Sequence, residues 1–251
     1  MSSTLPSRLP VLALDTATEQ IAVGLHTGVA AHTALGTGGP AASTRLLPEL
    51  LALLSLAGLT WSDVRAIAFG QGPGAFTGLR TACAVAQGLA WGLGCRLYPI
   101  DSLLVVAEDA RFQLQPNAAD LEVVVLMDAR IDEIYAARYR WQQGAWQVLH
   151  APALCSLALI QTQWATQAPA VVAGSALLAL GERLAWPALG QRCAHERDRA
   201  AALLRLAVAA VSRGDGLDPA DALPLYLRDK VAQTTAEREQ IRARAAQGVP
   251  P

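Results

Sequence analysis

The sequence predicts an α/β protein made of two related units, each a mixed β-sheet flanked by helices. Two apolar strands end in an aspartate, at Val11 to Asp15 and at Glu122 to Asp128, and a predicted pair of strands follows each of them. Helices and strands then alternate behind both pairs, and a glycine-rich loop joins one strand to a long helix. The order of elements agrees although the identity between the halves is slight, which indicates a duplication.

The first unit begins with the strand at 11–15. Runs at 21–26 and 29–35 predict two further strands joined by a tight Thr27-Gly28 turn. Ser43 or Thr44 is expected to cap a helix that ends near Ala57. A strand at 64–69 leads to the glycine loop, and Thr77 is the expected N-cap of a helix over 78–91. A strand at 96–100 and a helix at 102–112 follow.

The second unit repeats this order, with strands at 122–128, 134–141 and 145–150, a helix near 156–163, a strand at 170–173 and a helix that ends near Leu184. A last helix covers 200–211. We expect a first domain at 9–105 that carries a partner interface, a second domain at 106–231, and a polar tail at 232–251 that forms one helix or is disordered. The cleft between the domains is the default ligand site.

The composition excludes several classes of protein. The chain is 53% hydrophobic and only 16% charged, against about 25% in an average protein, and its formal net charge is -1. No global positive field therefore draws it to nucleic acid. Four scattered cysteines predict neither a disulfide framework nor a zinc site. There is no run of about 18 apolar residues, so we expect a cytoplasmic protein without a membrane partner.

The segment from Ala66 to Arg80 is the most informative in the chain. It reads as a short strand, a loop with glycines at 70, 72, 74 and 78, and the start of a helix. Glycines allow close backbone approach, and a helix N-terminus presents free N–H groups to a phosphate or to a partner's backbone. The spacing matches neither a Walker loop nor Gly-x-Gly-x-x-Gly. A plain tight turn from strand to helix is therefore the favoured alternative.

Candidate catalytic groups are few. Asp15 and Asp128 each end a strand, where a carboxylate holds a metal-bound phosphate or simply accepts hydrogen bonds from turn amides. The four histidines show none of the spacings of a metalloenzyme, and there is no Gly-x-Ser-x-Gly motif. We therefore expect no catalytic residue and no metal site. Asp15, Gly72, Gly74, Thr77 and Asp128 remain candidates for binding a nucleotide.

Two helices of the first unit predict a protein–protein interface. From Leu46 to Leu59 the only charged residue is Glu49, so this helix needs burial on more than one face. The next helix carries two stripes of small residues, at 82, 86 and 90 and at 84, 88 and 92. A sheet covers one face only, and small residues let a second helix approach closely. The interface candidates are Leu46, Leu47, Leu50, Leu54, Ala84, Gly88 and Gly92.

Three motifs of the chain resemble those of the TsaB family (also called YeaZ), non-catalytic relatives of TsaD. They are Leu14-Asp-Thr-Ala-Thr18, the segment Gly70-Gln-Gly-Pro-Gly-Ala-Phe-Thr-Gly-Leu-Arg80, and Asp128-Ala-Arg130 with Glu133-Ile-Tyr135. Pro224-Leu-Tyr-Leu-Arg228 adds to them near the end. The similarity runs from about Val11 to Val231.

The resemblance implies the actin-like ATPase (ribonuclease H-like) fold and a part in making threonylcarbamoyladenosine in tRNA. In that family TsaB binds and supports the TsaD transferase, and the TsaE ATPase completes the assembly. The resemblance thus implies TsaD and TsaE as partners, a homodimer when TsaD is absent, contact with tRNA only through the complex, and no catalysis by this chain alone. Because the fold often binds nucleotide, weak binding of ATP or ADP with Mg²⁺ stays open. A stand-alone ATPase or kinase and a glycoprotease-like peptidase are the alternatives.

Overall fold

The computed structural model describes residues 9–164, 170–184 and 190–228. The first five-stranded sheet has the strand order β3-β2-β1-β4-β5. Its central strand β1 pairs antiparallel with β2 and parallel with β4, and β2 carries the antiparallel edge strand β3. Its elements are β1 (Val11–Asp15), β2 (Gln20–His26), β3 (Ala31–Thr37), α1 (Ala42–Leu56), β4 (Ala66–Gly72), α2 (Phe76–Leu93) and β5 (Arg96–Asp101).

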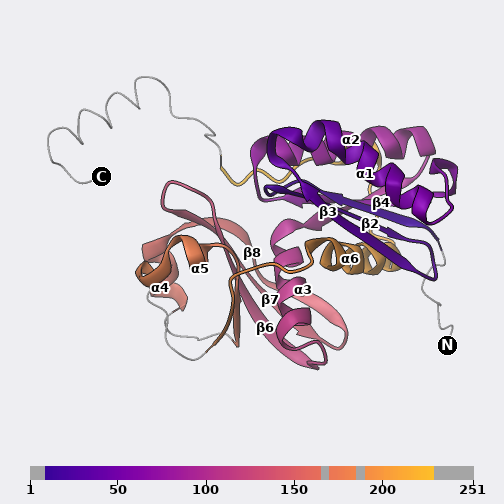
Figure 1. Ribbon diagram of the computed structural model, residues 1–251. Helices are drawn as coiled ribbons and strands as arrows, with labels where there is room; N and C mark the ends of the chain where they lie inside the picture. Colours follow the sequence, from indigo (N-terminus) through magenta and orange to yellow (C-terminus); the bar gives the residue numbers. More distant parts are fainter. Residues whose placement is uncertain (1–8, 165–169, 185–189, 229–251) are drawn as a thin grey trace, which may run out of the picture.

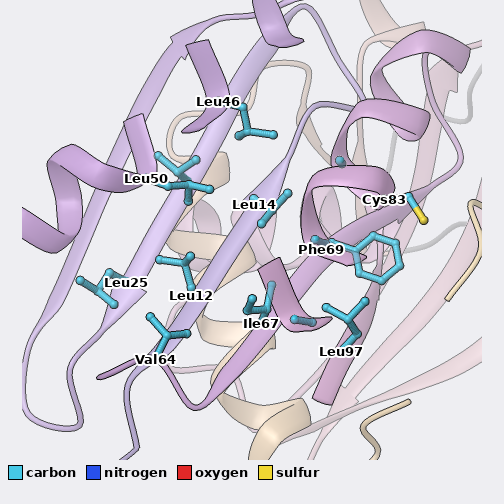
Figure 2. Packing of buried hydrophobic residues seen from close by; sticks show 14 of the residues in the cluster. Leu12, Leu14, Leu25, Leu46, Leu50, Val64, Ile67, Phe69, Cys83 and Leu97 are labelled. Carbon is cyan, nitrogen blue, oxygen red and sulfur yellow. The ribbon is translucent and has the colours of Figure 1, made fainter. Parts of the chain in front are cut away.

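Alternation along β1 explains how both faces of this sheet are covered. Leu12 and Leu14 point to the face that α1 and α2 cover, whereas Val11 and Ala13 point to the face that α6 (Arg199–Arg213) covers. Figure 2 shows the first face, where Leu46 and Leu50 of α1 lie over the strands. Because both faces are buried there, the central strands β1 and β4 are apolar over most of their length, whereas the edge strand β3 is partly exposed.

The second five-stranded sheet has the order β10-β9-β6-β7-β8. β6 pairs antiparallel with β7 and parallel with β9, so the pairing repeats that of the first sheet strand for strand. The helix α3 packs on one face and on α6, and α4 and α5 cover the other face (Figure 1). The elements are α3 (Ser102–Leu114), β6 (Asp120–Asp128), β7 (Glu133–Gln142), β8 (Ala145–Ser156), α4 (Leu157–Trp164), β9 (Val171–Ala173), α5 (Ala176–Ala179) and β10 (Gln191–Cys193).

Two mixed sheets flanked by helices are the predicted fold class, and this prediction is confirmed. The proposed domain limits stay a prediction. α6 follows the second sheet in sequence but packs on the first one, and it contacts α3 as well. The tail that we expected over 232–251 lies outside the described residues. No helix in the described ranges is long and apolar enough to cross a membrane.

Three predictions of local structure are wrong. The helix α2 begins at Phe76 with Ala75 as its N-cap, so Thr77 lies inside the helix and caps nothing. The helix α1 begins at Ala42 after Ala41, and neither Ser43 nor Thr44 caps it. In both places the first unpaired amides receive no side-chain bond, and the preceding loop sets where the helix begins. The predicted helix up to Leu184 is two short pieces, α5 and a 3₁₀ turn at Gly181–Arg183.

Candidate functional site

A cleft of about 930 Å³ lies between the two units. One wall comes from the first unit, with residues 17–20 after β1 and residues 73–76 before α2. The other comes from the second unit, with residues 127–130 at the end of β6, together with Ser175 and His195. Residues 225–228 also line it. The cleft therefore opens where the two central strands end, as expected for α/β sheets.

Asp15 ends β1, its partners Ser102 and Arg199 line this cleft, and its carboxylate accepts three hydrogen bonds. The Arg199 guanidinium donates to Asp15 Oδ2 at 2.9 Å, and the amide of Ala17 donates to Oδ1 at 2.5 Å. The Ser102 hydroxyl adds a longer bond of 3.4 Å. Both side chains of the ion pair are almost completely buried. Asp15 thus holds the turn after β1 and the start of α6 together.

Arg199 also reaches the second unit. Its other terminal nitrogen donates to Glu196 Oε2 at 2.6 Å, in the segment between β10 and α6. Burial lowers the pKa of this guanidinium, but the carboxylates of Asp15 and Glu196 more than offset the burial and raise its pKa overall. Arg199 is therefore a permanent internal cation between two acids. Its Nε is buried and has no hydrogen-bond partner among the residues that the structure describes.

The glycines of the β4–α2 loop are explained by close approach to the turn after β1. A Cβ at Gly78 would overlap the carbonyl oxygen of Thr16, and a Cβ at Gly74 would lie 2.5 Å from the carbonyl oxygen of Ala17. The Thr16 hydroxyl donates to the Gly78 carbonyl at 2.6 Å, and the Ala75 amide donates to the Ala17 carbonyl at 2.8 Å. The tight-turn alternative accounts for this motif within the chain itself.

Asp128 ends β6 and lines the cleft from the second unit. Its Oδ1 accepts from the Arg130 amide at 2.9 Å, and its own amide donates to the Ser175 hydroxyl at 3.1 Å. The Arg130 side chain lies 3.6 Å from its carboxylate and is mostly exposed. Unlike Asp15, Asp128 keeps part of its side chain open to the cleft.

The five candidate nucleotide-binding residues do not share one site. Gly74 and Asp128 line the cleft, Asp15 is buried, and Thr77 lines a separate groove on α2. Gly72, with a φ of 117°, faces the carbonyl of Leu225. A magnesium ion at Asp15 would have to displace the Arg199 guanidinium, so these residues do not fit a magnesium nucleotide there.

The structure divides the interface candidates into two groups. Leu46, Leu50 and Leu54 are fully buried against the strands of the first sheet, so they are core residues and cannot contact a partner. The prediction that these three leucines belong to the interface is wrong. They are spaced four residues apart, so they share one face of α1, and this is the face that packs on the sheet. Leu47 lies on the outer face of α1 and is 43% exposed. Ala84, Gly88 and Gly92 are exposed on α2, whereas the parallel stripe Ala82, Ala86 and Ala90 faces the sheet.

An outer surface therefore covers α1 and α2, which lie side by side on the first sheet (Figure 1). Leu51 on α1 and Trp91 on α2 join Leu47 there, 49% and 69% exposed. Outside the backbone of α2 itself, no heavy atom of the described residues lies within 4 Å of a Cβ built on Gly88 or Gly92. We call this set, Leu47, Leu51, Ala84, Gly88, Trp91 and Gly92, the docking surface.

The cysteines and the possible metal ligands do not form a further site in the described part of the chain. All four cysteines are free, and burial raises the pKa of each thiol. No three histidine, cysteine or acidic side chains gather in a metal-binding arrangement in the described part of the chain. The sequence reasoning missed Arg199 and Glu196, and no local signal marks Arg199, because it pairs with a residue 184 positions away.

Comparisons with known proteins agree with this architecture. Residues 40–173, just over half of the chain, match the family described as TsaD, tRNA N6-adenosine threonylcarbamoyltransferase. The chain is 29% identical over 230 residues to the tRNA threonylcarbamoyladenosine biosynthesis protein TsaB of Escherichia coli, with 88% of this chain and 96% of that protein covered. It is 39% identical to the TsaB of Haemophilus influenzae over 128 residues, 51% of this chain and 52% of that protein.

Among solved structures, YeaZ from Pseudomonas aeruginosa is 35% identical with a TM-score of 0.76, and the match covers 87% of this chain and all of that one. A second Pseudomonas aeruginosa structure, of a protein similar to peptidase YEAZ, is 34% identical with a TM-score of 0.77 over 88% of this chain. The predicted actin-like ATPase (ribonuclease H-like) fold is thereby confirmed. The chain belongs to the TsaB (YeaZ) family.

Proposed function

We propose that this chain is a supporting subunit of the complex that forms threonylcarbamoyladenosine in tRNA, where it binds and activates the TsaD transferase. The names of its Escherichia coli and Haemophilus influenzae relatives support the pathway. The net charge of -1 supports a role in which the complex, not this chain alone, holds the tRNA. We place the protein in the cytoplasm, with the TsaE ATPase as the further member of the assembly.

The observation that carries this proposal is the docking surface on α1 and α2. It gathers the exposed side chains of Leu47, Leu51 and Trp91 beside a stripe of small residues on two neighbouring helices. Apolar area is worth about 25 cal/mol per Å² when it leaves water, and a standard interface covers about 800 Å² on each partner. A surface of this kind is expected to be covered in the working protein.

A partner helix fits this surface best. Residues without large side chains at i and i+4 let the axes of two helices come close, and Trp91 then packs against the partner's flank. A TsaD subunit would supply helices in corresponding positions, since this chain matches the TsaD family over residues 40–173. Two related folds joined through the same face give a pseudo-twofold complex. A second copy of this chain is the occupant we propose in the absence of TsaD.

The experiment is a Gly88→Leu substitution. A Cβ at this position meets no described atom within 4 Å outside the backbone of its own helix, and leucine is a better helix former than glycine. We expect the variant to fold normally and to lose about 5- to 150-fold in affinity for TsaD, because overpacking costs about 1–3 kcal/mol. Titration calorimetry with purified TsaD measures the loss, and a tRNA modification assay with and without this chain measures activation.

The matched control is Ala209→Leu, which enlarges an exposed helical residue on α6, on the opposite face of the first sheet. Its affinity for TsaD should equal that of the unmodified chain. Equal binding by the Gly88→Leu and Ala209→Leu variants would count against the docking surface. Full tRNA modification by TsaD and TsaE without this chain would count against the supporting role.

A further inference from the structure

The segment after α6 crosses from the first unit to the second, and the proposed function leaves it without a role. Residues 222–228, which we call the strap, are tied first to β4 and α2. The Leu225 amide donates to the Gln71 carbonyl at 2.8 Å, and the Gln71 side chain donates back to the Leu223 carbonyl at 2.9 Å. The Gln87 side chain holds the Ala222 carbonyl at 3.0 Å. The near end of the strap is thus fixed to the first unit.

The far end of the strap is fixed to the second unit. The Arg228 guanidinium pairs with the Glu133 carboxylate at the start of β7, and it donates to the Arg130 carbonyl at 3.2 Å. Arg130, Ile131 and Asp132 all have a φ between 55° and 67°. Left-handed backbone costs about 1–2 kcal/mol for each such residue, so this turn is specified by its surroundings. The strap therefore spans the cleft, and residues 225–228 line it.

In the middle of the strap, Tyr226 contacts Phe76 and Arg80 of α2, and these three side chains separate the cleft from a groove on α2. Its ring packs on Phe76 with centroids 5.1 Å apart, and its hydroxyl accepts from Arg80 Nε at 3.0 Å. The Arg80 guanidinium lies 3.8 Å from the centre of the Phe76 ring. Phe76 lines both the cleft and a groove of about 430 Å³ on α2, and that groove also includes Ala84 of the docking surface. The three side chains thus have one side toward the cleft and the other toward the groove.

We infer that the strap couples the docking surface on α2 to the separation of the two units. A partner seated on α2 fixes Phe76 and Arg80, the ring stack and hydrogen bond fix Tyr226, and the pair between Arg228 and Glu133 carries this constraint to β7. Coupling of this kind is reciprocal, so loosening the far end of the strap weakens partner binding. The inference rests on the proposed function, because TsaD is the partner it invokes.

The test is Glu133→Gln in the full chain, a change on the second unit that alters no residue of the docking surface. It removes one charge of the pair with Arg228 and keeps the size of the side chain. We expect the Leu225 amide to exchange with deuterium at least tenfold faster. We expect the affinity for TsaD, measured by calorimetry, to fall about fivefold, at the lower end of typical coupling. Arg228→Gln should reproduce both effects from the other side of the pair.

The matched control is Asp132→Asn. This neighbouring acid pairs with Arg183 of the second unit, so the change in net charge is the same and the strap is not touched. It should leave both exchange and affinity unchanged. Unchanged exchange in the Glu133→Gln and Arg228→Gln variants would overturn the anchoring. Faster exchange with full affinity would overturn the coupling while the proposed function stands. No binding of TsaD by the unmodified chain would overturn both.

Discussion

The two units end their central strands in the same way and use the ends differently. β1 and β6 hold equivalent positions in sheets of matching strand order, and each ends in an aspartate. Both aspartates accept a hydrogen bond from the amide two residues later, at 2.5 Å for Asp15 and 2.9 Å for Asp128. The Asp15 side chain is completely buried, whereas that of Asp128 keeps 24% of its surface exposed.

The difference lies in where the cation comes from. Asp15 is paired with Arg199 from α6, a helix that follows the second sheet and returns to the first. Asp128 is paired with its near neighbour Arg130, at 3.6 Å and at the surface. At these equivalent positions, Asp15 therefore forms a buried junction with α6, whereas Asp128 forms part of the open wall of the cleft. The strand-end aspartate motif alone does not distinguish the two roles.

Removing each arginine should give the largest contrast. We expect Arg199→Met to lower the free energy of unfolding by about 3–5 kcal/mol, because it leaves Asp15 charged and buried without its cation. Arg130→Met should change it by less than about 1 kcal/mol, as exposed ion pairs do. Urea unfolding of both variants at neutral pH measures the two losses.

A double variant sharpens this contrast. Adding Asp15→Leu to Arg199→Met removes the orphaned charge, and most of the lost stability should return, since an apolar pair of similar size replaces a buried ion pair without much cost. Losses of equal size for Arg199→Met and Arg130→Met would contradict the distinction between junction and open wall.

The second contrast concerns Glu108, which joins the units through α3. Its carboxylate accepts from Arg111 at 2.9 Å, from Arg205 of α6 at 2.5 Å, and from the Trp146 indole of β8 at 3.0 Å. Burial raises the pKa of this carboxyl, but the bonds from Arg111 and Arg205 outweigh the burial and hold it below its ordinary value of 4.5. The ionised form is therefore the one that stabilises the fold.

We expect Glu108→Gln to cost about 3 kcal/mol at pH 7, because two arginines lose their buried carboxylate. A lowered pKa in the folded state means that the stabilisation is complete above pH 4.5 and is lost as the pH falls through the folded value. The difference in the free energy of unfolding between the Glu108→Gln variant and the unmodified chain should accordingly become smaller as the pH falls. Denaturant unfolding at pH 7, 5 and 3.5 measures it, with Glu49→Gln, in an exposed helical pair, as control. If this difference in the free energy of unfolding did not depend on pH, packing rather than the charge of Glu108 would account for the stabilisation.

The sequence predicts the order of elements well because apolar strands, turns and long helices leave local patterns. It fails where the decisive partner is distant or the signal is short. β10 has three residues, of which only Cys193 is buried, and no apolar run marks it. In α1 leucines point in several directions, so only the packed sheet decides that Leu50 faces inward and Leu47 outward.

The candidate site shows the same limit. The glycine motif predicts close backbone approach, and that prediction holds, but the approaching atoms belong to Thr16 and Ala17 of the same chain. The sequence predicts that Asp15 ends a strand, and it does, yet its cation comes from 184 residues away. Stripes of small residues lie on two sides of α2, and because their composition is alike, only the packed structure shows which stripe the sheet covers.

The smallest expected contrast is between two glycines of α2. Gly78, near the N-terminus of the helix, is in tight contact with the first unit, whereas Gly88 is exposed. Gly78 meets the Thr16 backbone next to Asp15, so Gly78→Ala forces the turn after β1 to shift and should cost about 1–3 kcal/mol. In mid-helix, a Cβ at Gly88 meets no atom of the described chain within 4 Å outside its own helix backbone, so Gly88→Ala should raise the free energy of unfolding of the isolated chain by about 0.5–1 kcal/mol. Thermal and urea unfolding of the two alanine variants measure the expected decrease in stability for Gly78→Ala and the expected increase for Gly88→Ala.

If Gly88→Ala lowered the free energy of unfolding in dilute protein, where no second copy is bound, this glycine would serve the fold of the chain itself. A gain at Gly88 together with weaker binding of TsaD would mean that glycine is retained there for the partner, at the expense of stability.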